Sequence, residues 1–317
     1  MGQLISRRLL TRIPLLIGIS IVSYGIIQFA PGDPTRLLAD PEMLTEEQME
    51  AARVQLGLDQ PLPVQYVRTM TSMFTGDLHS FQTREPVVAM IGDRLPATLA
   101  LTGASVVVGL GIGILVGVIQ ALKPYSRLDR VATSVTLFGF AVPNFWLALM
   151  MILIFSSQLG WFPASGIRPD DATGWNPIEM APYLVLPTIV LATGLMTSVA
   201  RYTRSSMLEA ITQDYVRSAR AKGLRERVVV GRHALRNSLL PVITLMGVQI
   251  PFLLGGAVAI ETIFALPGLG RLALDAVNMR DYPVIITVNV FIATGVLFAN
   301  LIADILYAAV DPRIRYK

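Results

Sequence analysis

The chain contains six stretches that carry no charged residue over at least twenty positions. They are 13–32, 95–122, 131–167, 180–200, 237–260 and 282–303. A helix needs about 20 mostly apolar residues to cross the hydrocarbon core of a bilayer. The third stretch exceeds one span, and the sequence SSQLGWFPASG at its end predicts an exit into a loop. Because the stretches are apolar on all sides, they predict an all-α membrane protein with six transmembrane helices.

The positive charges predict how these helices are oriented. Only 15% of the residues are charged, against about 25% in soluble domains. Eighteen of the 26 Lys and Arg residues fall in four segments that alternate with the outer ones: 1–12, 123–130, 201–238 and 311–317. Cytoplasmic loops carry such an excess, so both termini are expected in the cytoplasm. The first hydrophobic stretch is too long for a signal-peptide core and predicts an uncleaved first helix.

Four regions follow along the chain. We expect an N-terminal cytoplasmic end with the first span at 1–32, an extracytoplasmic helical segment at 33–94, a five-helix membrane core at 95–310 and a cytoplasmic tail at 311–317. The core includes the basic cytoplasmic loop 201–238.

The extracytoplasmic segment has its own helix signals. Thr45 and Gln48 have the spacing of a capping box, with Gly57 as the stop. A second short helix is predicted in DQPLPVQYVRTMTSMF, after a proline-rich turn, and REPVVAMIGDRLP is expected to lie along the membrane surface.

The second span carries a glycine at every fourth position, at Gly109, Gly113 and Gly117. Small residues at this spacing let two helix backbones approach closely. Packing inside one bundle and packing between subunits both explain the pattern.

The most charged part of the chain is the loop 201–238, which holds nine Lys and Arg against three acidic residues. Its segment DYVRSARAKG, at 214–223, predicts a short helix. On that helix Val216, Ala219 and Arg220 share one face, and Tyr215, Ala219 and Lys222 share another. Gly223 supplies the left-handed turn that ends such a helix. This helix either lies against lipid headgroups or is offered to a partner protein.

Motifs for catalysis are absent from the sequence. No Gly-Lys dipeptide occurs, so there is no GxxxxGK[ST] phosphate-binding loop, and neither HExxH nor GxSxG is found. The chain has no cysteine and two histidines, His79 and His233. We therefore expect a protein that is not an enzyme and holds no metal or cofactor.

Four polar residues of the spans are candidates for lining a pathway: Gln249, Glu261, Asn289 and Asn300. Polar groups inside a membrane are costly and therefore often functional. Each of them is equally able to cap a helix or pair with a neighbour.

Motifs along the whole chain resemble permease subunits in the dipeptide and oligopeptide branch of ABC importers. The similar segments are PGDP, LGLDQPL, GWFPASG, DYVRSARAKGLRERVVVGRHALRNSLLPVIT, LPGLGRLALDAV, RDYPVI and DPRIRYK. The resemblance implies the type I importer permease fold in a bacterial or archaeal inner membrane. It implies as partners a second, similar permease, two cytoplasmic ATPases that bind ATP and Mg, and an external solute-binding protein. That protein would dock on 33–94 or 264–281.

The resemblance also assigns a role to the basic helix. It implies ATPase coupling by nine consecutive residues: Tyr215, Val216, Arg217, Ser218, Ala219, Arg220, Ala221, Lys222 and Gly223. The broader importer family has Glu-Ala-Ala where this chain has Arg217, Ser218 and Ala219. Only the general role of a coupling helix docked in a groove of one ATPase is therefore carried over.

Import of dipeptides or oligopeptides is the function that the resemblance implies. Related cargoes are glutathione, nickel and oligosaccharides. A self-sufficient channel or secondary carrier is a different class of function, and a receptor or scaffold is another. Carriers are often built from paired halves, and no clear internal repeat is found here.

Overall fold

The computed structural model describes residues 2–29, 50, 51, 54, 57, 59–169 and 174–310. Of these, the side chains of 2–10, 251, 252, 254, 256, 304 and 306–310 are not described. The capping box expected at Thr45 and Gln48 lies outside the described residues. The chain forms two compact units, one of residues 1–98 and 267–297 and the other of 99–266 and 298–317. We call them unit 1 and unit 2.

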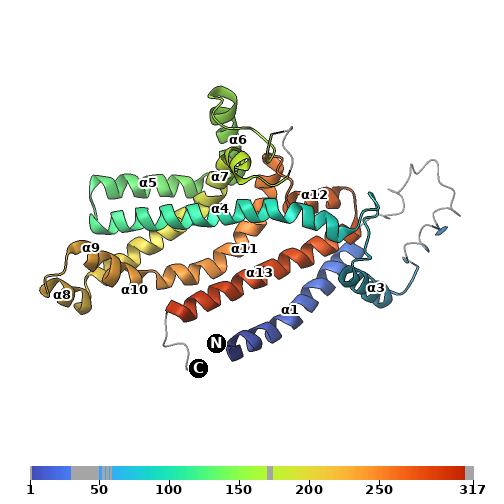
Figure 1. Cartoon of the computed structure of the whole chain (residues 1–317), viewed down its shortest axis with the longest axis horizontal. Coiled ribbons are helices and arrows are strands. Elements are labelled where there is room, and N and C mark those ends of the chain that lie inside the picture. Colours follow the sequence, from blue (N-terminus) through green and yellow to red (C-terminus); the bar gives the residue numbers. More distant parts are fainter. Residues whose placement is uncertain are drawn as a thin grey trace. The chain divides into compact units, whose positions relative to one another are not determined.

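Helices build all of the regular structure in the described residues, apart from one isolated bridge between His79 and Pro86. Unit 1 contains α1 (Gly2–Gln28), α3 (Leu62–Thr75), the start of α4 (Val87–Leu122), α12 (Leu269–Asn278) and α13 (Tyr282–Val310) as far as Leu297 (Figure 1). The short helix expected after the proline-rich turn is α3.

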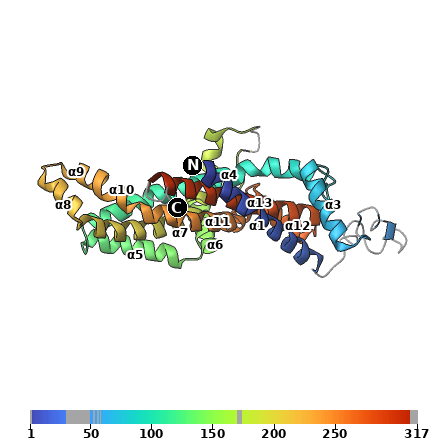
Figure 2. The ribbon, with the colours of Figure 1, turned by 90° about the horizontal axis from the view of Figure 1, so that it is seen from below.

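Unit 2 holds the remainder of α4 and α13 and the elements from α5 to α11 (Figure 2). These elements are α5 (Arg127–Ala141), α6 (Asn144–Met151), η2 (Ile152–Gln158), α7 (Pro177–Ile211), α8 (Asp214–Ala221), α9 (Glu226–Val228), η3 (Val229–Leu235), α10 (Arg236–Ser238) and α11 (Leu240–Ile263).

Each of the six apolar stretches is mainly helical in its described part, which confirms the fold class. Four described helices are long and apolar enough to cross a membrane: Thr11–Gln28, Val87–Leu122, Pro177–Ile211 and Tyr282–Ala303. The fifth stretch forms α11, which is 24 residues long.

The third stretch is not one straight helix, which corrects the expectation for 131–167. α5 and the α6–η2 helix meet at an angle of 104°. The break falls at Pro143, and Val142 before it has an extended backbone with φ −77° and ψ 126°. A proline disfavours helical backbone at the preceding residue and cannot donate a hydrogen bond to the turn behind it. The expected exit follows at Gly160, whose φ is +64°.

The segment before the second span is joined to it. Residues 87–94 form the first turns of α4, which is continuous from Val87 to Leu122 and includes Pro96. Their place along the membrane surface stays a prediction. At about 1.5 Å per residue, the 36 residues of α4 exceed the length needed for one span.

Unit 1 is held together by a polar seam between α1 and α3. Tyr24 donates a hydrogen bond to Gln65 Oε1 at 3.0 Å, and the hydroxyls of Ser20 and Tyr66 lie 2.8 Å apart. The rings of Tyr24 and Tyr66 meet edge to face with centroids 5.6 Å apart. Because Gln65 is buried and also donates to the Gln60 carbonyl, its amide is satisfied from both ends.

A buried carboxylate joins two loops of unit 1. Asp281 is 3% exposed and accepts hydrogen bonds from the Ser80 hydroxyl and the Phe81 backbone N–H. The side-chain amide of Gln82 donates to the Met279 carbonyl at 3.2 Å. The connection before α4 is thereby fixed to the α12–α13 corner, since a buried carboxylate is stable only when it is hydrogen-bonded.

Unit 2 is built around α7, the most buried of the four candidate spans. It packs against α11, α5 and α6, and both ribbon views show α7 beside α11 (Figures 1 and 2). Five of its buried side chains belong to one cluster with residues of α4, α6, α11 and the turn after α11: Leu101, Ala148, Leu186, Val190, Leu191, Leu195, Val199, Val242, Met246, Leu253, Ala257, Ile260, Phe264 and Leu266.

The three glycines of α4 face α7. A Cβ atom at Gly109 would lie 2.9 Å from Leu195, one at Gly113 2.8 Å from the Met196 carbonyl oxygen, and one at Gly117 2.6 Å from the Ala200 carbonyl oxygen. All three glycines lie in unit 2. Packing inside one bundle therefore accounts for the pattern, and no second subunit is needed to explain it.

Adding a methyl group at Gly113 tests this packing. The new methyl group in Gly113→Ala would meet the α7 backbone, so we expect a loss of about 1–3 kcal/mol in stability from overpacking. The matched control is Gly111→Ala, because nothing lies within 4 Å of a Cβ there. Thermal unfolding of the purified full chain in detergent measures both. Equal stability of the two variants would contradict close α4–α7 contact.

Candidate functional site

The basic loop begins where α7 ends. Residues Thr212 and Gln213 connect α7 to α8, and the Gln213 N–H donates to the Ala210 carbonyl at 3.1 Å. α8 has Asp214 in its first turn and Arg220 in its last, which suits the charges at the two ends of a helix dipole. A connection of two residues keeps α8 directly attached to the most buried helix of unit 2.

Val216 and Ala219 are the two α8 residues buried in unit 2, at 0% and 4% exposure. The spacing had placed Arg220 on the same face, but Arg220 is exposed. The cluster around them contains seven buried residues from α4, α7, α8 and η3: Ala121, Met207, Ala210, Val216, Ala219, Val229 and Ala234. α8 therefore packs against α4, α7 and η3 through a narrow apolar stripe.

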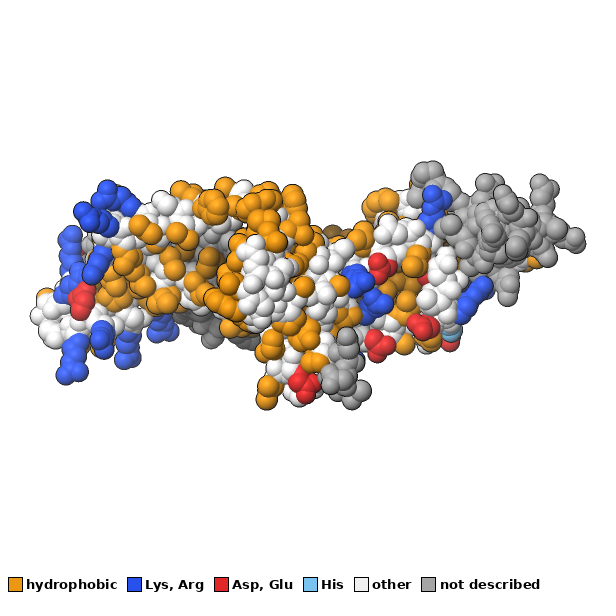
Figure 3. Space-filling view, turned by 90° about the horizontal axis from the view of Figure 1, so that it is seen from above, with side chains coloured by type: hydrophobic (Ala, Val, Ile, Leu, Met, Phe, Trp, Pro, Cys, Tyr) orange, Lys and Arg blue, Asp and Glu red, His pale blue; other side chains and the backbone are white. Residues whose placement is uncertain are grey.

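The rest of α8 is open. Tyr215 is 40% exposed, and six neighbours are also exposed: Arg217, Ser218, Arg220, Ala221, Lys222 and Gly223. Figure 3 shows Lys and Arg side chains gathered at this end of unit 2, beside faces covered by hydrophobic side chains. The open face of α8 is thus basic and carries one aromatic ring.

Gly223 ends α8 as its position in the sequence predicted. Its φ is +73°, in the left-handed region that L-residues with side chains rarely adopt. The Gly223 N–H donates to the Arg220 carbonyl at 2.9 Å, and the Leu224 N–H to the Ala219 carbonyl at 3.4 Å. The chain therefore reverses direction within two residues of α8.

An ion pair crosses this turn, and the sequence pattern did not single it out. Arg220 donates to both carboxylate oxygens of Glu226, at 2.7 and 3.2 Å. The Arg220 guanidinium lowers the pKa of Glu226 below its ordinary value, and Glu226 raises the pKa of Arg220. The pair is therefore intact above the ordinary glutamate pKa and is lost as the pH falls through the lowered value.

The segment after the turn returns to the membrane helices. η3 has wide, π-helical turns and packs against α8, α9, α10 and α7. α10 packs against both α7 and α11. α8 is thus linked to two spanning helices, α7 before it and α11 behind it. Wide helical turns of this kind often occur at functional sites.

A second ion pair, also not anticipated, fixes α5 to α7. Arg204 Nε and Nη2 donate to the two oxygens of Asp129 at 2.9 and 2.8 Å, and the Asp129 side chain is 4% exposed. Asp129 also accepts from the Tyr125 backbone N–H at 2.8 Å. It therefore holds the α4–α5 turn and the start of α5 against α7. Its signal in the sequence is only a lone acidic residue among basic ones.

The four pathway candidates are not gathered in one place. Gln249 and Glu261 lie twelve positions apart on α11, a separation of about 18 Å along a helix. Glu261 is 1% exposed, and Gln249 is half-buried. Asn300 has a buried Oδ1 without a hydrogen-bond partner among the described residues, and Asn289 lines a cavity of about 430 Å³ in unit 1. Their place in a pathway stays a prediction.

The fold is that of permease subunits of ABC importers. The chain matches a chain of the inward-facing MetNI methionine ABC transporter with a TM-score of 0.57 and 21% identity, over 72% of this chain and 99% of that one. It matches a chain of an amino acid ABC transporter with a TM-score of 0.52 and 16% identity, over 70% and 94%.

The sequence belongs to a transport family. Residues 110–316 match the family described as the binding-protein-dependent transport system inner membrane component, and residues 1–102 match its N-terminal model. The chain is therefore a membrane permease of this family, as its motifs predicted. It is 46% identical to the oligopeptide transport system permease protein AppB of Bacillus subtilis over the full length of both. It is 41% identical to the dipeptide transport system permease protein DppB of Alkalihalophilus pseudofirmus over 98% of both.

Replacing Arg204 by glutamine tests the buried ion pair. Arg204→Gln leaves the Asp129 charge without its partner, so we expect a loss of about 3 kcal/mol in stability. The double variant with Asp129→Asn should recover much of this loss because both charges are gone. Arg217→Gln is the matched control, since its pair with Asp214 at 3.7 Å is exposed. Unfolding in detergent measures all variants, and equal effects of Arg204→Gln and Arg217→Gln would refute the role of the pair.

Proposed function

We propose that this chain forms half of the translocation pathway of an ATP-dependent importer for dipeptides or oligopeptides. The proposal that the cargo is a peptide is supported by sequence identity of 46% and 41%, over nearly the full length, to permeases named for oligopeptide and dipeptide transport. The matched length includes the spans, the extracytoplasmic segment and the basic loop. This identity is therefore better support for cargo than any single motif.

The geometry of α8 supports a role in coupling. α8 is a short helix, joined by two residues to α7 and connected through η3 and α10 to α11. A rigid helix with its open face on a moving partner transmits that motion to the helices attached to its ends. We assign the docking face to Tyr215, Arg217, Ser218, Ala221 and Lys222, and the seat in unit 2 to Val216 and Ala219.

The proposal places ATP hydrolysis in other subunits. No GxxxxGK[ST] motif occurs in the sequence, so two cytoplasmic ATPases would bind ATP and Mg while this chain has no enzymatic activity of its own. The importer would also contain a second, similar permease and an external solute-binding protein. With α8 in the cytoplasm, both termini lie on the cytoplasmic side of the inner membrane.

A different cargo and a different class of transporter are the two alternatives to this function. The same architecture would serve glutathione, nickel or oligosaccharide uptake if the external binding protein selects a different cargo. A self-sufficient carrier would need no ATPase, and the exposed basic face of α8 would then contact lipid headgroups alone.

Reconstitution into liposomes tests the function. The chain is combined with its partner permease, ATPases and binding protein, and uptake of labelled di- and tripeptides is measured with and without ATP. We expect uptake only in the full assembly with ATP. Uptake by this chain alone would support a carrier, and no uptake of any peptide by an active assembly would exclude peptide cargo.

Substitution at Gly223 tests coupling within that assembly. Valine is β-branched and disfavours φ +73°, so Gly223→Val should disrupt the turn that orients α8. We expect peptide uptake to fall at least tenfold while the ATPases still co-purify with the permease. Hydrolysis and uptake would then no longer be proportional.

Gly231→Val is the matched control. Gly231 lies in the same loop, has no positive φ and has nothing within 4 Å of a Cβ position. It should therefore retain normal uptake. Normal ATP-dependent uptake by Gly223→Val would argue against the turn as the element that couples the two processes.

A further inference from the structure

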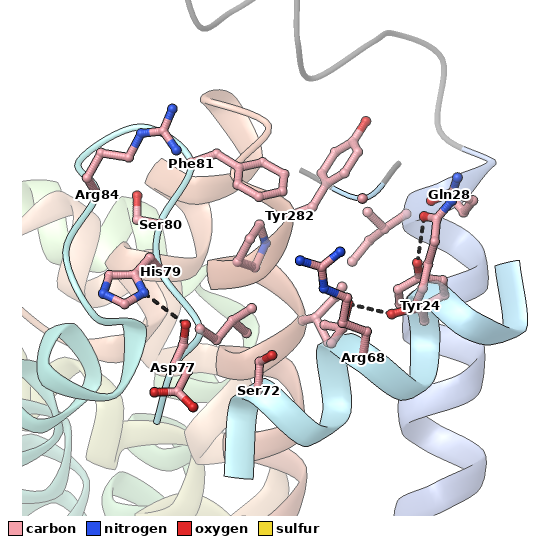
Figure 4. A pocket seen from close by; sticks show the side chains of 17 residues that line it. Tyr24, Gln28, Arg68, Ser72, Asp77, His79, Ser80, Phe81, Arg84 and Tyr282 are labelled. Atoms are coloured by element: carbon pink, nitrogen blue, oxygen red, sulfur yellow. Dashed lines mark hydrogen bonds between the residues drawn. The ribbon is translucent and has the colours of Figure 1, made fainter. Parts of the chain in front are cut away.

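Unit 1 contains a cavity of about 250 Å³ that the proposed pathway does not use. Its walls are the end of α1, one side of α3, the loop 77–84 and the start of α13 (Figure 4). Tyr24, Phe81 and Tyr282 supply aromatic surface, and Arg68, Asp77 and Arg84 supply charge. Aromatic walls with a few charged groups are the usual lining of a small-molecule site.

The position of Arg68 depends on a glycine. In Figure 4, Arg68 extends from α3 toward the middle of the cavity. A Cβ atom at Gly57 would lie 2.3 Å from Arg68 Nη1 and 3.2 Å from its Cζ. Gly57 also has φ +70°, so both the backbone and the space there suit glycine. The guanidinium is therefore seated against the Gly57 backbone.

Charged groups on this wall have no partner in the described part of the chain. Arg68 and Asp77 make no ion pair there, although His79 Nδ1 lies 2.9 Å from the Asp77 backbone oxygen. A guanidinium binds a carboxylate strongly because two parallel N–H groups match its two oxygens. A carboxylate such as Asp77 is in turn a partner for an ammonium group.

The size of the cavity and its two kinds of charge limit the ligand. Arg68 lies in α3, whereas Asp77 follows Gly76, which ends α3 with φ +83°. The two charges therefore stand on different segments of the cavity wall. A cavity of about 250 Å³ is small among ligand pockets, so it suits a dipeptide or tripeptide and not a longer peptide.

From these contacts we infer that the cavity is a binding site for a short zwitterionic peptide. The peptide carboxylate pairs with Arg68, its ammonium group pairs with Asp77, and its side chains contact the aromatic wall. This inference rests on the proposed peptide cargo and adds an external peptide site on the permease itself. The site is independent of α8 and of ATP.

Equilibrium dialysis of labelled trialanine against the purified full chain in nanodiscs tests the site. No ATP, ATPase or binding protein is present, so failure of binding and failure of uptake are separate results. We expect saturable binding that weakens at least tenfold for trialanine amide, which lacks the carboxylate. N-acetyl-trialanine, which lacks the ammonium group, should also bind more weakly.

Variants connect each loss to its residue. Arg68→Gln should weaken trialanine binding at least tenfold and remove the difference between trialanine and its amide. Asp77→Asn should remove the difference between trialanine and its N-acetyl form. The matched control is Arg94→Gln, because Arg94 lies on α4 and does not line the cavity. It should bind like the unchanged chain.

Three results would overturn the inference. They are no saturable binding by the unchanged chain, equal binding of trialanine and its amide, and an unchanged affinity in Arg68→Gln. The Arg68 side chain makes no hydrogen bond to another described residue and is exposed, so its replacement should not unfold unit 1. Thermal unfolding checks this point, and if Arg68→Gln is unfolded, the comparison of acid and amide on the unchanged chain decides.

Discussion

The close contact of α4 with α7 is the constraint on which unit 2 depends. Three glycines at intervals of four residues bring the two backbones together, with Gly113 and Gly117 facing carbonyl oxygens of α7. Lipid offers no hydrophobic driving force for such a contact, so dispersion at short range must provide it. This contact leaves α7 enclosed by α4, α5, α6 and α11. α7 is thus an enclosed helix of 35 residues, and two residues after its end α8 begins.

Two ion pairs fix α7 and α8 to neighbouring segments. Asp129 and Arg204 fix the α4–α5 turn to α7, and Arg220 and Glu226 close the turn behind α8. The first pair is buried and the second is exposed, so they differ in strength. A buried pair costs much to break once formed, whereas an exposed pair exchanges readily with water. The turn at Gly223 can therefore adjust while the base of α5 stays attached to α7.

The sequence predicted the helices better than their breaks and contacts. Apolar stretches located the spanning helices, and Gly223 was placed at the end of α8. Helical spacing put Val216 and Ala219 on one face, but it also put the exposed Arg220 there. Pro143 lies inside an uninterrupted apolar run, so composition concealed a bend of 104°. Partners such as Asp129 and Arg204 are 75 positions apart, and no local pattern relates them. The cavity around Arg68 likewise needs Gly57 and four other segments of unit 1.

In the proposed coupling, the turn at Gly223 matters more for the direction of α8 than the buried contact of α8 with unit 2. Two small side chains, Val216 and Ala219, attach the helix to unit 2. Burying a valine contributes only about 1.5–3 kcal/mol, and an alanine contributes less. In the proposed importer, so small a buried contact would not by itself resist an ATPase that moves α8. The direction of α8 must therefore be set by its covalent ends, which are the short link to α7 and the left-handed turn at Gly223.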